Sequence, residues 1–164
     1  MLVILALILL LGDRAGEEEA GGRGAGEPAG RAETTADVLR VVDGDTIEVD
    51  IDGTIEDVRY IGVDTPETVK PGTPVECFGK EASDFNHDLV EDRAVRLEFD
   101  NELRDDYSRL LAYVYVGDEF VNAELVAGGY ARTLEIEPNT SRAAQLGRLE
   151  AQAGTAGRGL WGAC

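Results

Sequence analysis

The chain has 164 residues, of which 43% are hydrophobic, and this is enough for one domain with one core. Asp and Glu number 33 against 15 Lys and Arg, which gives a net charge of −18 and excludes a nucleic-acid binder held by a broad basic surface, although not an enzyme with a local cationic site. The single histidine, His87, argues against Ser-His-Asp hydrolysis, Cys-His proteolysis and multi-histidine zinc sites.

An apolar run opens the chain at residues 2–11. It is too short to cross a bilayer, which takes about 20 residues, and it is typical of a secretory signal, although basic residues before it and a clear cleavage site are missing. We therefore expect residues 1–11 to form a signal or a membrane anchor, with a buried helix as the alternative. Residues 12–35 carry no large apolar side chain and predict a disordered, acidic, glycine-rich linker. The folded domain then spans residues 36–164, secreted or anchored outside the cell.

Three strands are predicted at the start of the domain. Residues 39–43 are a short apolar run, and residues 46–51 alternate between apolar and polar side chains. Asp52-Gly53 is a two-residue hairpin signal that leads into a third strand over residues 55–63. Pro66 ends this region, because proline cannot donate to a strand ladder.

A helix and two more strands are predicted in the middle of the domain. Residues 78–90 have helical spacing, and residues 95–99 and 110–116 have the composition of strands. The apolar stripe of the helix consists of Phe78, Ala82, Phe85 and Leu89.

Two helices are predicted at the end of the domain. Asn122 can cap a short helix that Gly128-Gly129 stops, and residues 139–141 can cap a last helix. The inner face of that last helix carries Leu146, Leu149 and Ala153. Strands in meander order, one inserted helix and terminal helices argue for an α+β, mainly β fold: a five-stranded barrel of the OB type with three flanking helices.

The two cysteines, Cys77 and Cys164, lack the C-x-x-C spacing of zinc sites and thioredoxins. Export would place them in an oxidising environment, so we expect a disulfide between them. The chain-entropy account gives such a long loop about 4–5 kcal/mol. Two separate buried thiols are the alternative.

Side chains that can bind ions or take part in catalysis gather in three short segments, at residues 43–46, 59–68 and 105–109. Asp45 and Asp64 follow different strands and can supply oxygen ligands to a hard cation such as Ca²⁺. Arg59 and Arg109 offer planar donors suited to phosphate oxygens, and Glu67 can activate a water. Each segment alone has a structural explanation as a turn, a cap or a surface ion pair, but together they are the set that a phosphodiesterase needs.

These segments also carry a family resemblance. VVDGDTIEVDIDGTIEDVRYIGVDTPET, FGKEAS, DDYSRLLAYVYV, VNAELVAGGYAR and the RLEAQA…GLW tail resemble, in this order, the staphylococcal-nuclease-like (thermonuclease) family over about residues 39–161. The resemblance implies an OB-fold barrel with three helices and Ca²⁺-dependent hydrolysis of DNA and RNA to products with 3′-phosphate ends.

By position, the resemblance implies a set of metal ligands. Asp45 and Asp64 would bind Ca²⁺ through their carboxylates, and Thr65 through its backbone carbonyl. Asp43 would lie next to the metal without binding it.

The resemblance also implies the residues that handle the substrate. Arg59 and Arg109 would clamp the scissile phosphate and stabilise the transition state, and Glu67 would activate the attacking water. Tyr107 would contact the terminal phosphate of a bound nucleotide.

The chain departs from the family at the substrate side. Asp106 stands where the family has a lysine, Leu134 and Ile136 stand where it has two base-packing tyrosines, and only Lys70 remains of a lysine-rich loop. These changes predict weak substrate binding in dilute salt. In concentrated salt they should cost less affinity, because counterion release contributes less to binding there.

The composition is consistent with a saline environment. Only Lys70 and Lys80 are lysines, and at about 1 M salt a Debye length of roughly 3 Å screens the repulsion between surface carboxylates. An ordinary acidic protein kept soluble by its charge is the alternative.

Two other functions compete with a secreted, monomeric nuclease acting on DNA and RNA. One is a non-catalytic OB module that binds single-stranded nucleic acid or a protein partner, which the net charge and the missing tyrosines favour. The other is a structural Ca²⁺-binding domain, which explains the carboxylates but leaves Arg59 and Arg109 without a role.

Overall fold

The computed structural model describes residues 32–68, 72 and 74–164. The apolar run at residues 2–11, most of the expected linker and Lys70 lie outside these residues. Within them, no helix is long and apolar enough to cross a membrane.

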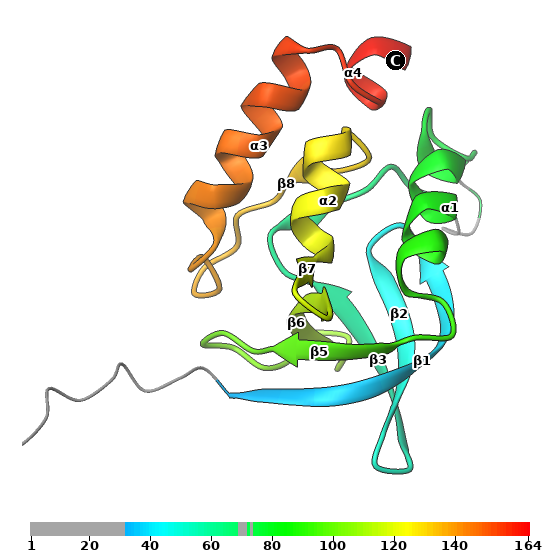
Figure 1. Ribbon diagram of the computed structural model, residues 1–164, viewed down its shortest axis with the longest axis vertical. Helices are drawn as coiled ribbons and strands as arrows, with labels where there is room; N and C mark the ends of the chain where they lie inside the picture. The colour runs from blue at the N-terminus through cyan, green and yellow to red at the C-terminus, as the bar shows by residue number, and fades with distance from the viewer. Residues whose placement is uncertain (1–31, 69–71, 73) are drawn as a thin grey trace, which may run out of the picture. The chain divides into compact units, whose positions relative to one another are not determined.

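Five strands close into a barrel (Figure 1). They are β1 (Glu33–Asp43), β2 (Thr46–Ile51), β3 (Thr54–Tyr60), β5 (Ala94–Glu98) and β6 (Leu110–Val116). β1 pairs antiparallel with β2 and with β5, β2 with β3, and β5 with β6, and the parallel pairing of β3 with β6 closes the ring. The α+β fold with an OB-type barrel is therefore confirmed.

Three short strands complete the sheets in the part of the chain that the structure describes. β7 (Glu119–Phe120) extends the barrel beside β6, and β4 (Val63–Asp64) pairs with β8 (Arg132–Thr133). The expected third strand is interrupted at Gly62, where φ is 79° and an added Cβ would come within 2.7 Å of Leu146 Cδ1. Glycine is the residue that accepts this turn without strain, and the turn redirects the chain into β4.

The folded part of the chain begins earlier than expected. β1 starts at Glu33, and Glu33, Thr34 and Thr35 pair with β5, although the sequence placed them in the linker. Strand pairing uses backbone groups, and the β-branched threonines favour it, so a prediction based on large apolar residues overlooked this part of the strand.

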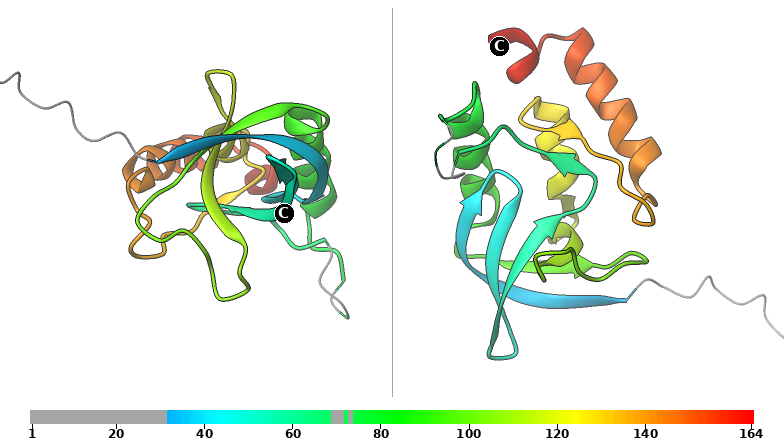
Figure 2. Two further views of the ribbon diagram at one scale, coloured as in Figure 1. Left: turned by 90° about the horizontal axis from the view of Figure 1, so that it is seen from below. Right: turned by 180° about the vertical axis from the view of Figure 1, so that it is seen from behind.

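The described residues form four helices, which lie at one end of the barrel, opposite the projecting β2–β3 hairpin (Figures 1 and 2). They are α1 (Gly79–Val90), α2 (Val121–Gly128), α3 (Ala143–Thr155) and the single turn α4 (Leu160–Ala163). α2 packs between α1 and α3, and buried side chains of α2 and the barrel form one continuous core. The three predicted helices are thus present, and α4 is an addition.

The predicted helix caps are wrong. α2 begins at Val121, and Asn122 is buried within it, where its Oδ1 accepts from the Val114 N–H and its Nδ2 donates to the Ile61 carbonyl, at 2.9 and 2.8 Å. Asn139 likewise bonds both backbone groups of Glu102 rather than capping α3. These asparagines satisfy buried strand and loop groups, which the sequence around them does not reveal.

The buried stripe of α1 is shifted from the predicted one. Ala82 is buried as expected, but its neighbours on the stripe are Gly79, Asn86 and Val90. Phe85 lies on the flank, where its ring stacks on Tyr130 with 4.0 Å between the centroids.

The disulfide between Cys77 and Cys164 is present, with 6.0 Å between the two Cα atoms. It joins the segment before α1 to the end of α4. The expected pairing is therefore confirmed, and the alternative of two separate thiols is excluded.

We expect Asn122→Ala to lower the free energy of unfolding by about 2–4 kcal/mol, because the Val114 N–H and the Ile61 carbonyl would remain buried without a partner. Urea denaturation measures this loss. Glu124→Ala, on the exposed side of the same helix, is the control and should change stability by less than about 0.5 kcal/mol. A loss below about 1 kcal/mol for Asn122→Ala would show that these two groups find other partners.

Denatured, unreduced protein should contain no titratable thiol, and reduction should release both. Reduction should also lower the free energy of unfolding by about 2–5 kcal/mol, because the unfolded chain loses a long closed loop. Thiol titration followed by urea denaturation of reduced and oxidised protein checks both statements. Two thiols in the unreduced sample would contradict them.

Candidate active site

A small polar cavity of about 190 Å³ opens where the turn between β1 and β2 meets β3 and β4. It is lined by Asp43, Asp45, Thr46, Arg59, Asp64, Thr65, Pro66, Glu67 and Arg109. Every residue that the sequence suggested as a cation ligand, a phosphate clamp or a water activator lies on this one cavity. The structure does not place Tyr107 there.

Strand register brings these residues together. Arg59 on β3 pairs with Thr46 on β2 and with Leu111 on β6. Asp45 directly precedes β2 and its carbonyl accepts from the Tyr60 N–H at 2.9 Å, while Arg109 directly precedes β6. Residues far apart in the sequence therefore meet where β2, β3 and β6 lie side by side.

Arg59 bridges the two carboxylates that were predicted to bind a cation. Its Nη1 contacts Asp45 Oδ1, and its Nη2 lies 3.0 Å from Asp64 Oδ1. The Asp45 side chain is only 6% exposed and that of Arg59 16%, whereas that of Asp64 is 56% exposed. The pair of Arg59 with Asp45 is therefore largely withdrawn from water, and Asp64 faces the opening.

Thr65 fixes the second oxygen of Asp45. Both its backbone N–H and its hydroxyl donate to Asp45 Oδ2, at 2.8 and 3.0 Å. Gly44 makes room for this contact, since an added Cβ would lie 2.6 Å from the Thr65 hydroxyl oxygen. The segment after β4 is thus bonded directly to the β1–β2 turn.

Asn86 supports the same turn from α1. Its Nδ2 donates to the Asp43 carbonyl at 3.0 Å, and its Oδ1 accepts from the Tyr60 hydroxyl at 3.0 Å. The sequence analysis missed this residue. A polar side chain spaced four residues from both Ala82 and Val90, on one buried helix face, was the available signal.

The cavity carries more negative charge than Arg59 compensates. Burial, together with the charge of Asp45, raises the pKa of Asp43 to about 6. Burial also raises the pKa of Asp64, although Arg59 opposes it. For Arg59, burial lowers the pKa, but the neighbouring carboxylates outweigh this and the net pKa is raised. The carboxylates compete for one guanidinium group, so a further cation would be stabilised here.

Arg109 is held in place by Asp105. The Arg109 Nε donates to Asp105 Oδ2 at 2.7 Å, and Asp105 Oδ1 accepts from the backbone N–H of Arg109 and of Tyr107. The guanidinium is therefore oriented by a carboxylate four residues earlier in the chain. The sequence analysis quoted Asp105 within the motif DDYSRLLAYVYV and assigned it no role.

Tyr107 lines neither this cavity nor the larger pocket that adjoins it at Arg59 and Arg109. It is 82% exposed, and its ring centroid is 5.5 Å from the Arg109 Cζ. Its observed neighbour is the guanidinium of Arg109, and its contact with a terminal phosphate stays a prediction.

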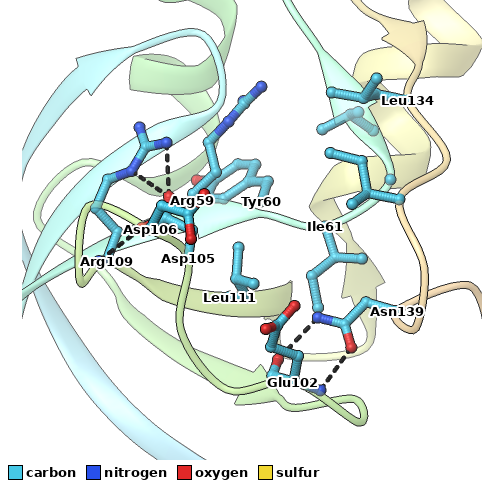
Figure 3. A pocket seen from close by; sticks show the side chains of 13 residues that line it. Arg59, Tyr60, Ile61, Glu102, Asp105, Asp106, Arg109, Leu111, Leu134 and Asn139 are labelled. Atoms are coloured by element: carbon cyan, nitrogen blue, oxygen red, sulfur yellow. Dashed lines mark hydrogen bonds and ion pairs between the residues drawn. The ribbon is translucent and has the colours of Figure 1, made fainter.

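A second pocket of about 240 Å³ adjoins the polar cavity and shares Arg59 and Arg109 with it. Figure 3 shows both arginines at one end and Asn139 at the other. Leu111, Leu134 and Ile136 supply apolar surface. The wall also carries the carboxylates of Glu102, Asp105 and Asp106. The aliphatic substitutions noted in the sequence thus face a pocket directly beside the arginine pair.

No preformed metal centre of three or more Asp, Glu, His or Cys side chains occurs among the described residues. Asp43 Oδ1 accepts from the Asp45 N–H at 3.1 Å, and Arg59 lies between Asp45 and Asp64. The candidate metal ligands are carboxylate oxygens in a polar cavity with excess negative charge. Oxygen ligands of this kind are those that a hard cation such as Ca²⁺ requires.

Several known proteins are similar to this sequence. The family described as staphylococcal nuclease homologue matches residues 57–163. The chain is 41% identical to the thermonuclease of Staphylococcus hyicus over 161 residues, which covers 98% of this chain and 95% of that protein. It is 55% identical to the thermonuclease of Staphylococcus intermedius over 102 residues, or 62% of this chain and 61% of that protein.

A relative from another genus is longer. The endonuclease YncB of Bacillus subtilis (strain 168) is 47% identical over 115 residues, which is 69% of this chain and about half, 54%, of that protein. The family match covers most of the folded residues, and the Staphylococcus hyicus relative is matched over almost its whole length. This chain is a member of the staphylococcal nuclease family.

Proposed function

We propose that this protein is a secreted, metal-dependent nuclease that hydrolyses phosphodiester bonds in DNA and RNA. The observation that carries the proposal is the single cavity on which Asp45, Asp64, Glu67, Arg59 and Arg109 converge. The thermonucleases and endonucleases among its relatives support it.

The two arginines would bind the scissile phosphate. Attack on a phosphodiester builds negative charge on its oxygens, and fixed donors that face this charge stabilise the transition state. Arg59 is held by Asp45 and Asp64, and Arg109 by Asp105, so both groups are oriented before substrate arrives. Because arginine stays protonated at any working pH, this clamp does not depend on a tuned pKa.

Glu67 would accept the proton of the attacking water. It lies on the cavity wall, and its Oε1 accepts from the Thr68 N–H at 2.9 Å. A carboxylate that is held by a backbone N–H and faces the phosphate site can act as a general base. We expect the products to carry 3′-phosphate ends.

A hard cation, Ca²⁺ in our proposal, would be held by Asp45, Asp64 and the Thr65 carbonyl, with Asp43 beside it. When bound, it supplies positive charge to the phosphate oxygens. The excess carboxylate charge of the cavity supports this assignment. Asp43 then serves to raise the affinity for a cation through its charge.

We further propose that the protein works outside the cell in concentrated salt, as a monomer. The Cys77–Cys164 disulfide is typical of an oxidising compartment. Asp106 and the acidic surface weaken the nonspecific attraction to nucleic acid in dilute salt, a loss that matters less as salt rises.

With Ca²⁺ we expect cleavage of DNA and RNA, and none after chelation with EGTA. Arg59→Ala and Glu67→Gln should each lower kcat by about 100-fold or more, because each removes a group that acts on the transition state. Gel and single-turnover assays in dilute and in molar salt measure these losses.

Matched controls separate these losses from general effects of mutation. Arg40→Ala removes an exposed arginine of β1 that is paired with Glu48, and Glu81→Gln removes an exposed carboxylate of α1. Both should keep activity within about twofold. Unchanged cleavage in Arg59→Ala or Glu67→Gln would refute the assigned roles. Intact nucleic acid under every condition, with binding retained, would favour a non-catalytic module.

The titration of Asp43 predicts a pH dependence of stability. The pKa of an unperturbed aspartate is 3.8, and that of Asp43 in the folded protein is about 6, so between these values the folded state holds the additional proton. The free energy of unfolding of the metal-free protein should therefore fall as the pH rises from about 4 to about 6, and stay lowered above that. Asp43→Asn keeps an oxygen for the Asp45 N–H and should raise this free energy by about 1–2 kcal/mol at about pH 7, but not at about pH 4.

Denaturation in EDTA at both pH values measures this difference. Addition of Ca²⁺ should then stabilise the wild type more than Asp43→Asn, because a ligand that binds the folded state stabilises it more when it binds more tightly. Equal stability of the two proteins at both pH values would show that Asp43 carries no uncompensated charge.

A further inference from the structure

Glu76 lies beside Glu67, although the two are nine residues apart in the sequence. Its side-chain Oε2 accepts from the Glu67 N–H at 3.1 Å, and its own N–H donates to the Glu67 carbonyl at 2.9 Å. Both backbone groups of Glu67 are therefore bonded to one residue. Glu76 is exposed and lines neither the polar cavity nor the second pocket.

The start of α1 packs against the same backbone. Gly79 donates its N–H to the Glu76 carbonyl at 3.0 Å. An added Cβ at Gly79 would lie 3.0 Å from the Glu67 carbonyl oxygen and 2.9 Å from Thr68 Cγ2. The helix thus begins in direct contact with the segment that carries Glu67, and glycine permits this approach.

The disulfide anchors this arrangement to the far end of the chain. Cys77, next to Glu76, is bonded to Cys164, whose N–H donates to the Leu160 carbonyl within α4. Leu160 is only 3% exposed, and its N–H donates to the Gly129 carbonyl after α2 at 2.9 Å. The segment at Glu76 is therefore tied by a covalent bond to the end of α4, which the buried Leu160 anchors in the helical layer.

We propose that Glu76, anchored through Cys77–Cys164, is a positioning residue that holds the backbone of Glu67 so that its carboxylate faces the cavity. This inference rests on the proposed role of Glu67 as the water-activating group. A displacement of about 1 Å of a reacting group can cost roughly 100-fold in rate, so a residue that touches no substrate can limit turnover. The carboxylate of Glu76 acts as a hydrogen-bond acceptor, and its charge is not required.

The test compares Glu76→Ala with Glu76→Gln, in which an amide oxygen remains to accept the Glu67 N–H. We expect Glu76→Ala to lower kcat by about 10- to 100-fold with KM within about threefold, and Glu76→Gln to stay within about threefold of the wild type. Glu81→Ala, an exposed change in the first turn of α1, is the control. An equal loss in Glu76→Gln would overturn the inference, because it would point to the charge and hence to cation or substrate binding.

A double-mutant cycle separates positioning from a general structural effect. If Glu76 acts through Glu67, Glu76→Ala should cost less than about twofold in the Glu67→Gln background. The same fold-loss in both backgrounds would show that Glu76 acts through another group or on the fold as a whole.

Hydrogen exchange supplies a readout that does not depend on catalysis. In Glu76→Ala the amide of Glu67 should exchange at least about tenfold faster, while the amides of the barrel strands keep their rates. Reduction of the disulfide should likewise increase the exchange rate of the Glu67 amide, and it should lower kcat. Unchanged exchange at Glu67 in both cases would refute the inference even if the protein is a nuclease. Faster exchange without any nuclease activity in the wild type would instead refute the proposed function alone.

Discussion

The site depends on one ion-paired group, the guanidinium of Arg59 between Asp45 and Asp64. An arginine that is 16% exposed beside an aspartate that is 6% exposed is stable only while the pair remains intact, because removal of one partner leaves a buried charge at a cost of about 3–5 kcal/mol. The same contact joins the β1–β2 turn to β3 and β4. It therefore fixes the relative positions of the groups that line the cavity, and we expect it to orient Arg59 for phosphate.

Buried polar side chains hold the rest of the scaffold to this contact. Asn86 bonds the β1–β2 turn to α1, and Asn122 bonds β6 and the turn before β4 to α2. Each is fully buried and forms at least two hydrogen bonds, so each position accepts few other residues. The helices thus stabilise the strand ends that carry the site as well as covering the core.

Negative charge has two different effects in this molecule. On the surface, carboxylates far outnumber cations, which weakens nonspecific attraction to nucleic acid. In the cavity, burial together with the charge of Asp45 raises the pKa of Asp43 to about 6, and the carboxylates keep Arg59 charged against the effect of burial. The first effect is screened by salt over a few ångströms, whereas the buried pairs are screened much less. A local site can therefore remain suited to a phosphate on a protein of the same overall sign.

Local hydrophobic periodicity and short motifs in the sequence predicted the order of the five barrel strands and three helices, the barrel class, the family and most of the residues that line the cavity. The sequence also indicated the cysteine pair. Contacts between residues distant in the chain are visible only in the folded structure: Asn122 and Asn139 are buried partners rather than caps, Arg59 bridges Asp45 and Asp64, Tyr107 faces solvent, and Glu76 accepts a hydrogen bond from the Glu67 N–H. No local pattern connects these groups, because a side chain's hydrogen-bond partners are set by strand register and packing.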